Sequence, residues 1–330
     1  MTAPAAPTQQ SPATPGGPKG RNLVAVTYRY SMLGVLAILI VVASILYDGF
    51  LAPDNLRDIL VQNASVGIIA VGMTFVIISG GFDLSVGATY ALGSTVFAGV
   101  MISTNSIALA GVIALAAGVV CGLANGLLVA RLKINPFVAT LGSASVIAGI
   151  AYIYSNSAPF IVSDRSFQAL ANSRTLGVPT PILILLVTFT VGGLVLSKTT
   201  VGRNVQAVGG NVEAAWLSGL RVPTLTAGVY VLTGALAALA GMIDASRLAV
   251  GQADVGATMA LDAIAIVVVG GTSLRGGEGA MWRSFVGLLI LATLTNVFYS
   301  LNVSQHWQLI AKGLIVIAAV ALDAAVRRKS

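Results

Sequence analysis

The chain has 330 residues, of which 56% are hydrophobic and 9% charged, and its formal net charge is +7. Because an ordinary soluble domain is about 25% charged, this composition excludes a mostly water-exposed surface and predicts one that contacts lipid. The basic residues are scattered and form no patch, which disfavours nucleic-acid binding. The only cysteine, Cys121, cannot form an intrachain disulfide, and with a single histidine no metal site is expected.

Residues 1–30 are predicted to form a disordered tail, because Met1 to Lys19 is rich in Pro, Ala, Thr, Gln and Gly. Apolar segments follow, most of them near the roughly 20 residues that a helix needs to cross a bilayer. They are Ser31–Tyr47, Ala64–Ser79, Val86–Ser103, Ile107–Ala130, Phe137–Tyr154, Pro181–Ser197, Thr224–Ala245, Met259–Gly271, Ala280–Ser300 and Gln308–Val326. The sequence thus predicts an all-α polytopic membrane protein with about ten transmembrane helices over residues 31–326, followed by a basic C-terminus at 327–330.

Lysine and arginine predict the orientation of these helices. With the N-terminus in the cytoplasm, most of the basic residues fall on the cytoplasmic side. An even number of crossings returns the basic C-terminus, with Arg327, Arg328 and Lys329, to the same side. Both termini are therefore expected in the cytoplasm, and the tail and the C-terminus with them.

The segment Gly80–Gly87 (GGFDLSVG) is the most polar interruption of the apolar pattern. A charge near the bilayer centre costs about 2.5–3.5 kcal/mol, so the position of Asp83 requires a reason. Either Asp83 caps a helix that starts at Leu84, with Ser85 supporting the turn, or it belongs to the solute path or its gate. Gly80, Gly81, Asp83 and Ser85 are therefore candidates for a helix break or gate.

A second glycine pair, Gly270–Gly271, interrupts the chain in a similar way and supplies two further gate candidates. The segment Val76–Gly87 resembles Val267–Gly279 in outline, since each has an apolar stretch, a glycine pair, a polar turn and another helix. Paired interrupted helices in two halves of a chain often mark the centre of a transporter. An internal repeat is therefore possible, although glycine pairs are also common in membrane helices.

Several amides and aromatic rings stand within or beside apolar segments. The amides need hydrogen-bond partners there, so they either join neighbouring helices or line a polar pathway of the size of a sugar. The aromatic rings either stack on a sugar or take part in the core. The candidates for the solute path are Phe82, Asn125, Phe137, Asn296 and Gln308.

The loop Thr200–Pro223 (TVGRNVQAVGGNVEAAWLSGLRVP) is predicted to hold a short helix. Asn211 can cap its N-terminus, Glu213 suits its first turn, and Gly219 can end it. An exposed helix of about two turns with a small apolar face, made by Ala214, Ala215 and Leu217, can dock on another protein. It can also be an ordinary connection. The candidate docking residues are Asn211, Glu213, Ala214, Ala215, Ser218 and Gly219.

The chain has no G-x-x-x-x-G-K-[ST] phosphate-binding loop, and no HExxH, CxxC or GxSxG motif. ATP hydrolysis by this chain is therefore not expected, and neither is any other catalytic activity. Energy for transport must come from a partner or from an ion gradient.

With these motifs the chain resembles the permease subunits of bacterial ABC importers for ribose, xylose, arabinose, galactose and related monosaccharides. They belong to a superfamily that also includes branched-chain amino acid permeases. The resemblance runs from about Asn55 to Asp323. Two departures, Ala148–Gly149 and Arg283–Ser284, weaken any assignment of one sugar. The matching segments are Gly80–Ala88 (GGFDLSVGA), Asn125–Gly126, Asn135–Gly142 (NPFVATLG), Thr200–Leu220, Gly270–Gly277 (GGTSLRGG) and Gly287–Asp323.

The resemblance implies a location in the bacterial cytoplasmic (inner) membrane and a translocation path between two permeases, either two copies or this chain and a paralogue. It also implies a cytoplasmic ATPase subunit that holds ATP and Mg²⁺, so that this chain carries no cofactor, and a periplasmic or lipid-anchored sugar-binding protein. Thr200–Leu220 matches the loop that couples to the ATPase. The alternatives are a related ABC permease for an amino acid or nucleoside, and an ion-coupled secondary carrier or channel.

Overall fold

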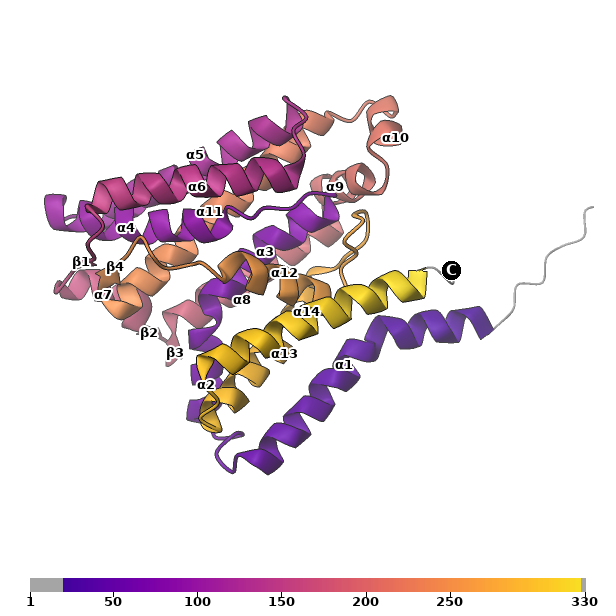
Figure 1. Cartoon of the computed structure of the whole chain (residues 1–330), viewed down its shortest axis with the longest axis horizontal. Helices are drawn as coiled ribbons and strands as arrows, with labels where there is room; N and C mark the ends of the chain where they lie inside the picture. The colour runs from indigo at the N-terminus through magenta and orange to yellow at the C-terminus, as the bar shows by residue number, and fades with distance from the viewer. Residues whose placement is uncertain (1–19, 328–330) are drawn as a thin grey trace, which may run out of the picture. The chain divides into compact units, whose positions relative to one another are not determined.

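A computed structural model describes residues 20–327, which are mostly helical (Figure 1). The disordered tail predicted for Met1 to Lys19, and the last three residues of the basic C-terminus, lie outside the described residues. The helices are α1 (Gly20–Leu46), α2 (Pro53–Gln62), α3 (Ala64–Ile78), α4 (Val86–Thr104), α5 (Ile107–Ala130), α6 (Pro136–Ser155), α7 (Arg165–Asn172), α8 (Thr180–Lys198), α9 (Thr200–Gly210), α10 (Val212–Leu217), α11 (Val222–Leu248), α12 (Met259–Val269), α13 (Met281–Ser300) and α14 (Gln305–Arg327).

Every predicted apolar segment coincides largely with a helix, and α5 has the predicted bounds. Helix α1 begins at Gly20 instead of Ser31, so it includes residues that were predicted as tail. Within residues 20–327, six helices are long and apolar enough to cross a membrane, and a seventh span results if α2 and α3, bent by 52°, are counted as one. Two further apolar helices, Ser31–Leu46 and α12, are shorter. The chain is a polytopic helical membrane protein, and the number of ten crossings stays a prediction.

Three helices were not predicted, namely α2, α7 and α9. Each is short and carries polar residues, so none contains an apolar run of membrane length. The remaining regular structure is two pairs of antiparallel two-residue strands. Strand β1 (Phe160–Ile161) pairs with β4 (Val250–Gly251), with Phe160 opposite Gly251, and β2 (Arg174–Thr175) pairs with β3 (Val178–Pro179), with Arg174 opposite Pro179.

Of the described residues, 32–327 form one unit, whose core lies around α3, α4 and α11. Of the most apolar window of α4, 78% is buried, against 22% for α6. Small residues allow the central helices to approach closely. A Cβ atom on Gly241 of α11 would lie 2.1 Å from the carbonyl oxygen of Tyr90 on α4, so only glycine fits there.

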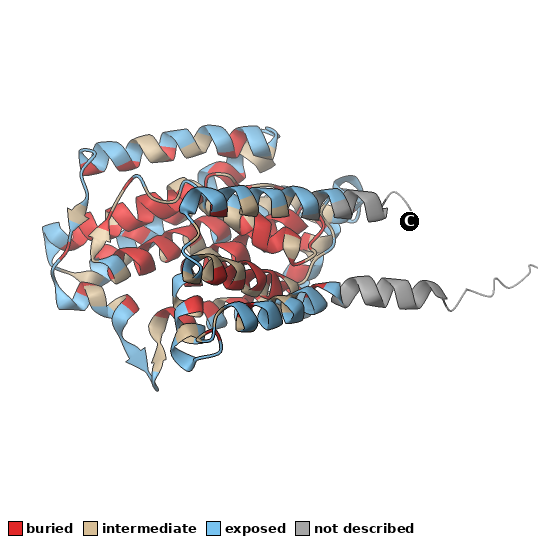
Figure 2. Ribbon diagram, turned by 60° about the horizontal axis from the view of Figure 1, so that its bottom comes forward, coloured by how far each residue is buried: buried red, intermediate tan, exposed pale blue. Residues whose placement is uncertain are grey.

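Exposed residues lie along the outside of the helices (Figure 2). On α5, α6 and α8 they include large apolar side chains. Val112, Val146 and Ile153 are 65%, 64% and 79% exposed. In water such faces would be unfavourable, and in a bilayer they contact acyl chains. The burial pattern therefore agrees with the lipid-contacting surface that the composition predicts.

Candidate functional site

The first helix break follows α3, where the helix ends in a turn that requires glycine. Gly80 has φ 84°, in the left-handed region. Its N–H donates to the carbonyl of Ile77 at 3.0 Å, and the N–H of Gly81 donates to that of Val76 at 2.9 Å. These two bonds form a Schellman motif, so the sequence prediction of a break at this glycine pair is confirmed.

Asp83 does not cap the following helix in the predicted way, because α4 begins at Val86 and not at Leu84. Its carboxylate is buried, and Oδ1 accepts hydrogen bonds from the backbone N–H of Ser85 at 2.9 Å and from the hydroxyl of Ser85 at 2.6 Å. Asp83 therefore closes a tight turn just before the helix. Its part in the solute path or gate stays a prediction.

Ser85 links this turn to α5. Nδ2 of Asn125 donates to Oγ of Ser85 at 2.6 Å, and Asn125 is 1% exposed. The other amide atom, Oδ1 of Asn125, is buried without a hydrogen-bond partner among the described residues. The structure thus brings three candidates together, Asp83, Ser85 and Asn125, with Phe82 beside them in the same segment.

Two further helices hold the first break, through residues that sequence reasoning did not single out. The hydroxyl of Tyr230 on α11 donates to the carbonyl of Phe82 at 3.0 Å. The N–H of Leu84 donates to Oγ1 of Thr140 on α6 at 3.1 Å. Thr140 belongs to the NPFVATLG motif, so this motif and GGFDLSVGA meet in the fold although more than 50 residues separate them.

The second break repeats the backbone pattern of the first. Gly271 has φ 83°. Its N–H donates to the carbonyl of Val268 at 2.8 Å, and the N–H of Thr272 donates to that of Val267 at 3.2 Å. Helices α3 and α12 therefore end in the same motif, which supports a local equivalence of the two breaks.

A contact between three glycine-containing segments joins the first break, and the loop after the second, to α9. We call it the glycine junction; it comprises Ile78–Gly80, Gly209–Gly210 and Gly276–Gly277. The N–H of Gly277, in the loop after the second break, donates to the carbonyl of Ile78 at 2.8 Å. A Cβ atom on Gly209 would lie 1.8 Å from the same oxygen, and one on Gly276 would lie 2.9 Å from Cα of Gly80. The backbones touch directly because no side chain stands between them.

Helix α10 starts directly after the glycine junction. Oδ1 of Asn211 accepts from the N–H of Ala214 at 2.9 Å, and Gly219, with φ 82°, lies just beyond the end of the helix, so both predicted helix signals are confirmed. Ser218 donates from Oγ to the carbonyl of Ala214 at 2.8 Å, and Glu213 lies in the first turn.

The predicted apolar face of α10 is wrong in its composition. Ala215 is 4% exposed and turns inward, whereas Ala214 and Leu217 are exposed. The exposed apolar side chains are Trp216, at 65%, and Leu217, at 71%. With about 100° per residue, residues 214 and 217 lie about 60° apart around the helix, whereas residue 215 lies about 100° from one and about 160° from the other, so the turn that buries Ala215 leaves the other two exposed.

A cavity of about 790 Å³ lies between α10, the ends of α3 and α5, and the start of α11. Gly80, Gly81, Glu213 and Trp216 are among the residues that line it. The first break and the exposed helix therefore border the same space. Lys133 and Glu213 give this cavity one charge of each sign.

Two candidates for the solute path use their polar groups to hold the ends of helices. Nδ2 of Asn296 on α13 donates to Oδ1 of Asn55 on α2 at 2.9 Å. Nε2 of Gln308 donates to the carbonyl of Val303 at 2.9 Å, at the start of α14. Phe137, beside the cap residue Asn135, is 52% exposed on α6. Contact of these residues with a solute stays a prediction.

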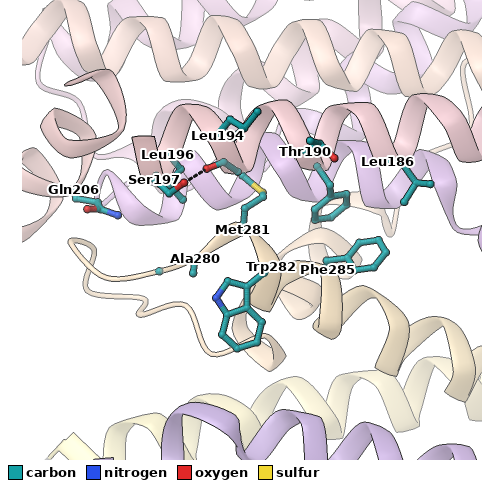
Figure 3. Close-up of a pocket in the computed structure, with 13 residues that line it drawn as sticks. Leu186, Thr190, Leu194, Leu196, Ser197, Gln206, Ala280, Met281, Trp282 and Phe285 are labelled. Atoms are coloured by element: carbon teal, nitrogen blue, oxygen red, sulfur yellow. Dashed lines mark hydrogen bonds between the residues drawn. The ribbon is translucent and has the colours of Figure 1, made fainter. Parts of the chain in front are cut away.

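An apolar groove of about 450 Å³ is lined by residues of α8 and α13 (Figure 3). The side chains of Met281, Trp282 and Phe285 lie on one side of it, opposite Leu186 and Thr190. The hydroxyl of Ser197 is directed back to its own helix, where it donates to the carbonyl of Gly193 at 2.6 Å. Walls of this kind suit apolar chains better than a sugar, which needs many hydrogen-bond partners.

Comparison with known proteins places the chain in a family. Residues 55–320 match the family described as "Branched-chain amino acid transport system / permease component". The chain is 42% identical to the ribose import permease protein of Bacillus subtilis over 297 residues, which cover 89% of this chain and 91% of that protein. It is 40% identical to the ribose import permease protein of Escherichia coli (strain K12) over 293 residues, or 87% and 91% of the two chains.

A third relative is the L-arabinose transport system permease protein of Escherichia coli (strain K12), which is 37% identical over 295 residues, or 89% of this chain and 90% of that protein. No solved structure matches the chain. Because the family covers most of the chain and these relatives match along nearly their full length, the chain belongs to the permease family of bacterial transport systems for branched-chain amino acids and sugars.

Proposed function

We propose that this chain is the permease subunit of an ATP-binding cassette importer that moves a monosaccharide across the membrane by alternating access. The relatives named for ribose and arabinose support a sugar as the solute. The observation that carries the mechanism is the position of α10. This helix exposes Trp216 and Leu217, and it directly follows the glycine junction, which contacts the first break and the loop after the second.

In this proposal α10 is the site where a separate ATPase subunit attaches. Exposed Trp and Leu side chains on a short helix between two spans fit a groove on a partner. The side of α10 is then the cytoplasmic side of the inner membrane, both termini lie there, and ATP and Mg²⁺ belong to the partner. A second permease, identical or paralogous, completes the path, and a periplasmic or lipid-anchored binding protein delivers the sugar.

The mechanism follows from the backbone contacts. When the ATPase moves α10, the displacement reaches Gly209–Gly210 and through them the ends of α3 and of the loop after α12. These contacts join backbone to backbone, so no side chain between them can absorb the displacement by changing its rotamer. Both breaks then reorient together, which opens the path on one side as it closes on the other.

The test is replacement of the exposed apolar side chains of α10. Trp216→Ala with Leu217→Ala should abolish most of the uptake of D-ribose or L-arabinose, and the ATPase should no longer co-purify with the permease. The matched control is Leu176→Ala, because Leu176 is 99% exposed in the turn between β2 and β3, away from α10. The control should keep both properties.

Normal uptake and normal ATPase association in the double variant would contradict the assignment of α10. Competition by leucine, but not by either sugar, would contradict the assignment of the solute.

A further inference from the structure

A third cavity differs from the groove of Figure 3 in its polar lining. It measures about 350 Å³ and lies between the bend of α2 and α3, the end of α11, and helices α12, α13 and α14. We call it the ion-pair recess. Its volume is in the range of small-molecule sites, about 300–1,000 Å³. Its polar lining includes Asn63, Arg247, Asp262, Thr295, Tyr299 and Lys312.

Charged groups of both signs are half-buried in this recess. Nζ of Lys312 on α14 lies 3.3 Å from Oδ1 of Asp262 on α12, and these side chains are 25% and 21% exposed. Nη2 of Arg247 lies 3.0 Å from Oδ1 of Asp244, whose Oδ2 accepts a hydrogen bond from Tyr90. Charges within membrane helices are costly and commonly mark solute pathways, so these two ion pairs make the recess a candidate functional site.

The recess offers donors and acceptors but little net charge. Arg247 and Lys312 are balanced by Asp244 and Asp262, so the site does not favour an anion. A carboxylate, a guanidinium, an ammonium and an amide can together accept and donate the many hydrogen bonds of a neutral polyhydroxy ligand. Tyr299, 57% exposed, adds an aromatic face for the apolar side of a sugar ring.

We infer that the ion-pair recess is a monosaccharide-binding site on this chain, in which hydroxyl groups of the sugar bind Asp262, Arg247 and Lys312. This inference rests on the proposed function. The recess reaches inward along α13 from Tyr299 to Leu288, so the site extends from the end of that helix toward its middle.

Helix α12 connects this site to the second break. Asp262 lies in its first turn, and Gly270, which directly follows the last residue of the helix, is about 12 Å away along the axis. A sugar that binds Asp262 and weakens its ion pair with Lys312 frees the first turn of α12 from α14. Occupancy of the recess therefore acts on the helix that ends at Gly270–Gly271.

Cysteine protection tests the site directly. Cys121→Ser removes the only cysteine, and Thr295→Cys then places one thiol in the recess. In membranes that contain the complete transporter, D-ribose or L-arabinose at tens of millimolar should slow maleimide labelling of residue 295 at least threefold. Labelling of a control thiol, Ser163→Cys, in the exposed loop after β1, should not change.

When Asp262→Asn is added to the variant with Cys121→Ser and Thr295→Cys, the sugars should no longer slow the labelling of residue 295. Unchanged labelling of residue 295 with either sugar, or protection by leucine alone, would overturn the inference.

Transport kinetics separate binding from a purely mechanical role of the ion pair. Asp262→Asn should raise the half-saturating sugar concentration for uptake about tenfold, and the exchanged pair Asp262→Lys with Lys312→Asp should not restore it. The control Asp54→Asn breaks the exposed pair with Arg57 on α2 and should leave uptake unchanged.

Unaltered half-saturation in the exchanged pair would show that the two charges only join α12 to α14, and would overturn the inference. These outcomes can be told apart from failure of the proposed function: a transporter with the unsubstituted chain that imports no sugar contradicts the function itself. Normal import without protection of residue 295 contradicts only the recess.

Discussion

The two helix breaks have the same backbone turn but very different surroundings. Both end an apolar helix with a left-handed glycine and the same pair of hydrogen bonds. The first is then held by side chains from α5, α6 and α11. At the second, Thr272 has a buried hydroxyl without a partner among the described residues, and the loop that follows exposes Arg275. The glycines set the turn, and the side chains around it set how firmly it is held.

This difference predicts that the two breaks differ in how easily they move. The first is fixed to three neighbouring helices, so it is expected to move only with them. At the second, Nη1 of Arg283 on α13 donates to the carbonyl of Gly271 at 3.3 Å, and the loop that follows contacts the first break backbone to backbone at the glycine junction. We therefore expect the second break to be the more compliant one.

The largest effect should come from the junction that joins the two breaks. Gly209→Ala places a methyl group 1.8 Å from the carbonyl oxygen of Ile78, where only backbone atoms are present to yield. Overpacking typically costs about 1–3 kcal/mol and occasionally more, and we expect at least the upper end of this range. Thermal unfolding in detergent and sugar uptake should both show the loss.

Gly210→Ala is the matched control for this prediction, because its methyl group would meet nothing closer than Cα of Gly277, at 4.0 Å. It should leave stability and uptake nearly unchanged. Equal behaviour of the two variants would show that the close approach at Gly209 is not a constraint.

A smaller and equal effect is expected at the two left-handed glycines. Gly80→Ala and Gly271→Ala both have room for a methyl group, with nearest atoms at 3.8 Å and 3.6 Å, so only the backbone angle opposes them. A left-handed conformation costs a residue with a side chain about 1–2 kcal/mol. Both variants should therefore lower the free energy of unfolding by about that amount.

Asparagine tolerates the left-handed region better than alanine, so Gly80→Asn and Gly271→Asn should recover part of the stability at each break. A loss at one break of more than twice the loss at the other would show that the shared turn does not determine the cost.

Local signals in the sequence were sufficient for part of this architecture. Apolar runs of membrane length located the long helices, and the glycine pairs located both breaks. The cap at Asn211 and the end at Gly219 also follow from near neighbours. Each of these features depends on residues a few positions apart.

The contacts that hold the site could not be predicted in this way, because they join distant segments. The hydroxyl of Tyr230 finds the carbonyl of Phe82 across 148 positions, and Gly209 meets Ile78 only after the helices assemble. Which side of α10 turns inward likewise depends on how α9 and α11 are placed, so the burial of Ala215 and the exposure of Trp216 were missed.

The sharpest contrast, and at Thr272 the smallest effect, concerns one hydroxyl at each break. Ser85→Ala removes the group that donates to Asp83 and accepts from Asn125, and leaves both buried and less satisfied. This should cost about 1–3 kcal/mol. Thr272→Val replaces a hydroxyl that bonds nothing within the described residues with a methyl group of similar shape, so it should be neutral or slightly stabilising. Thermal unfolding of the two variants side by side measures the contrast. A loss for Thr272→Val as large as that for Ser85→Ala would mean that the second break is held by side chains as firmly as the first, and the expected compliance of that break would have to be abandoned.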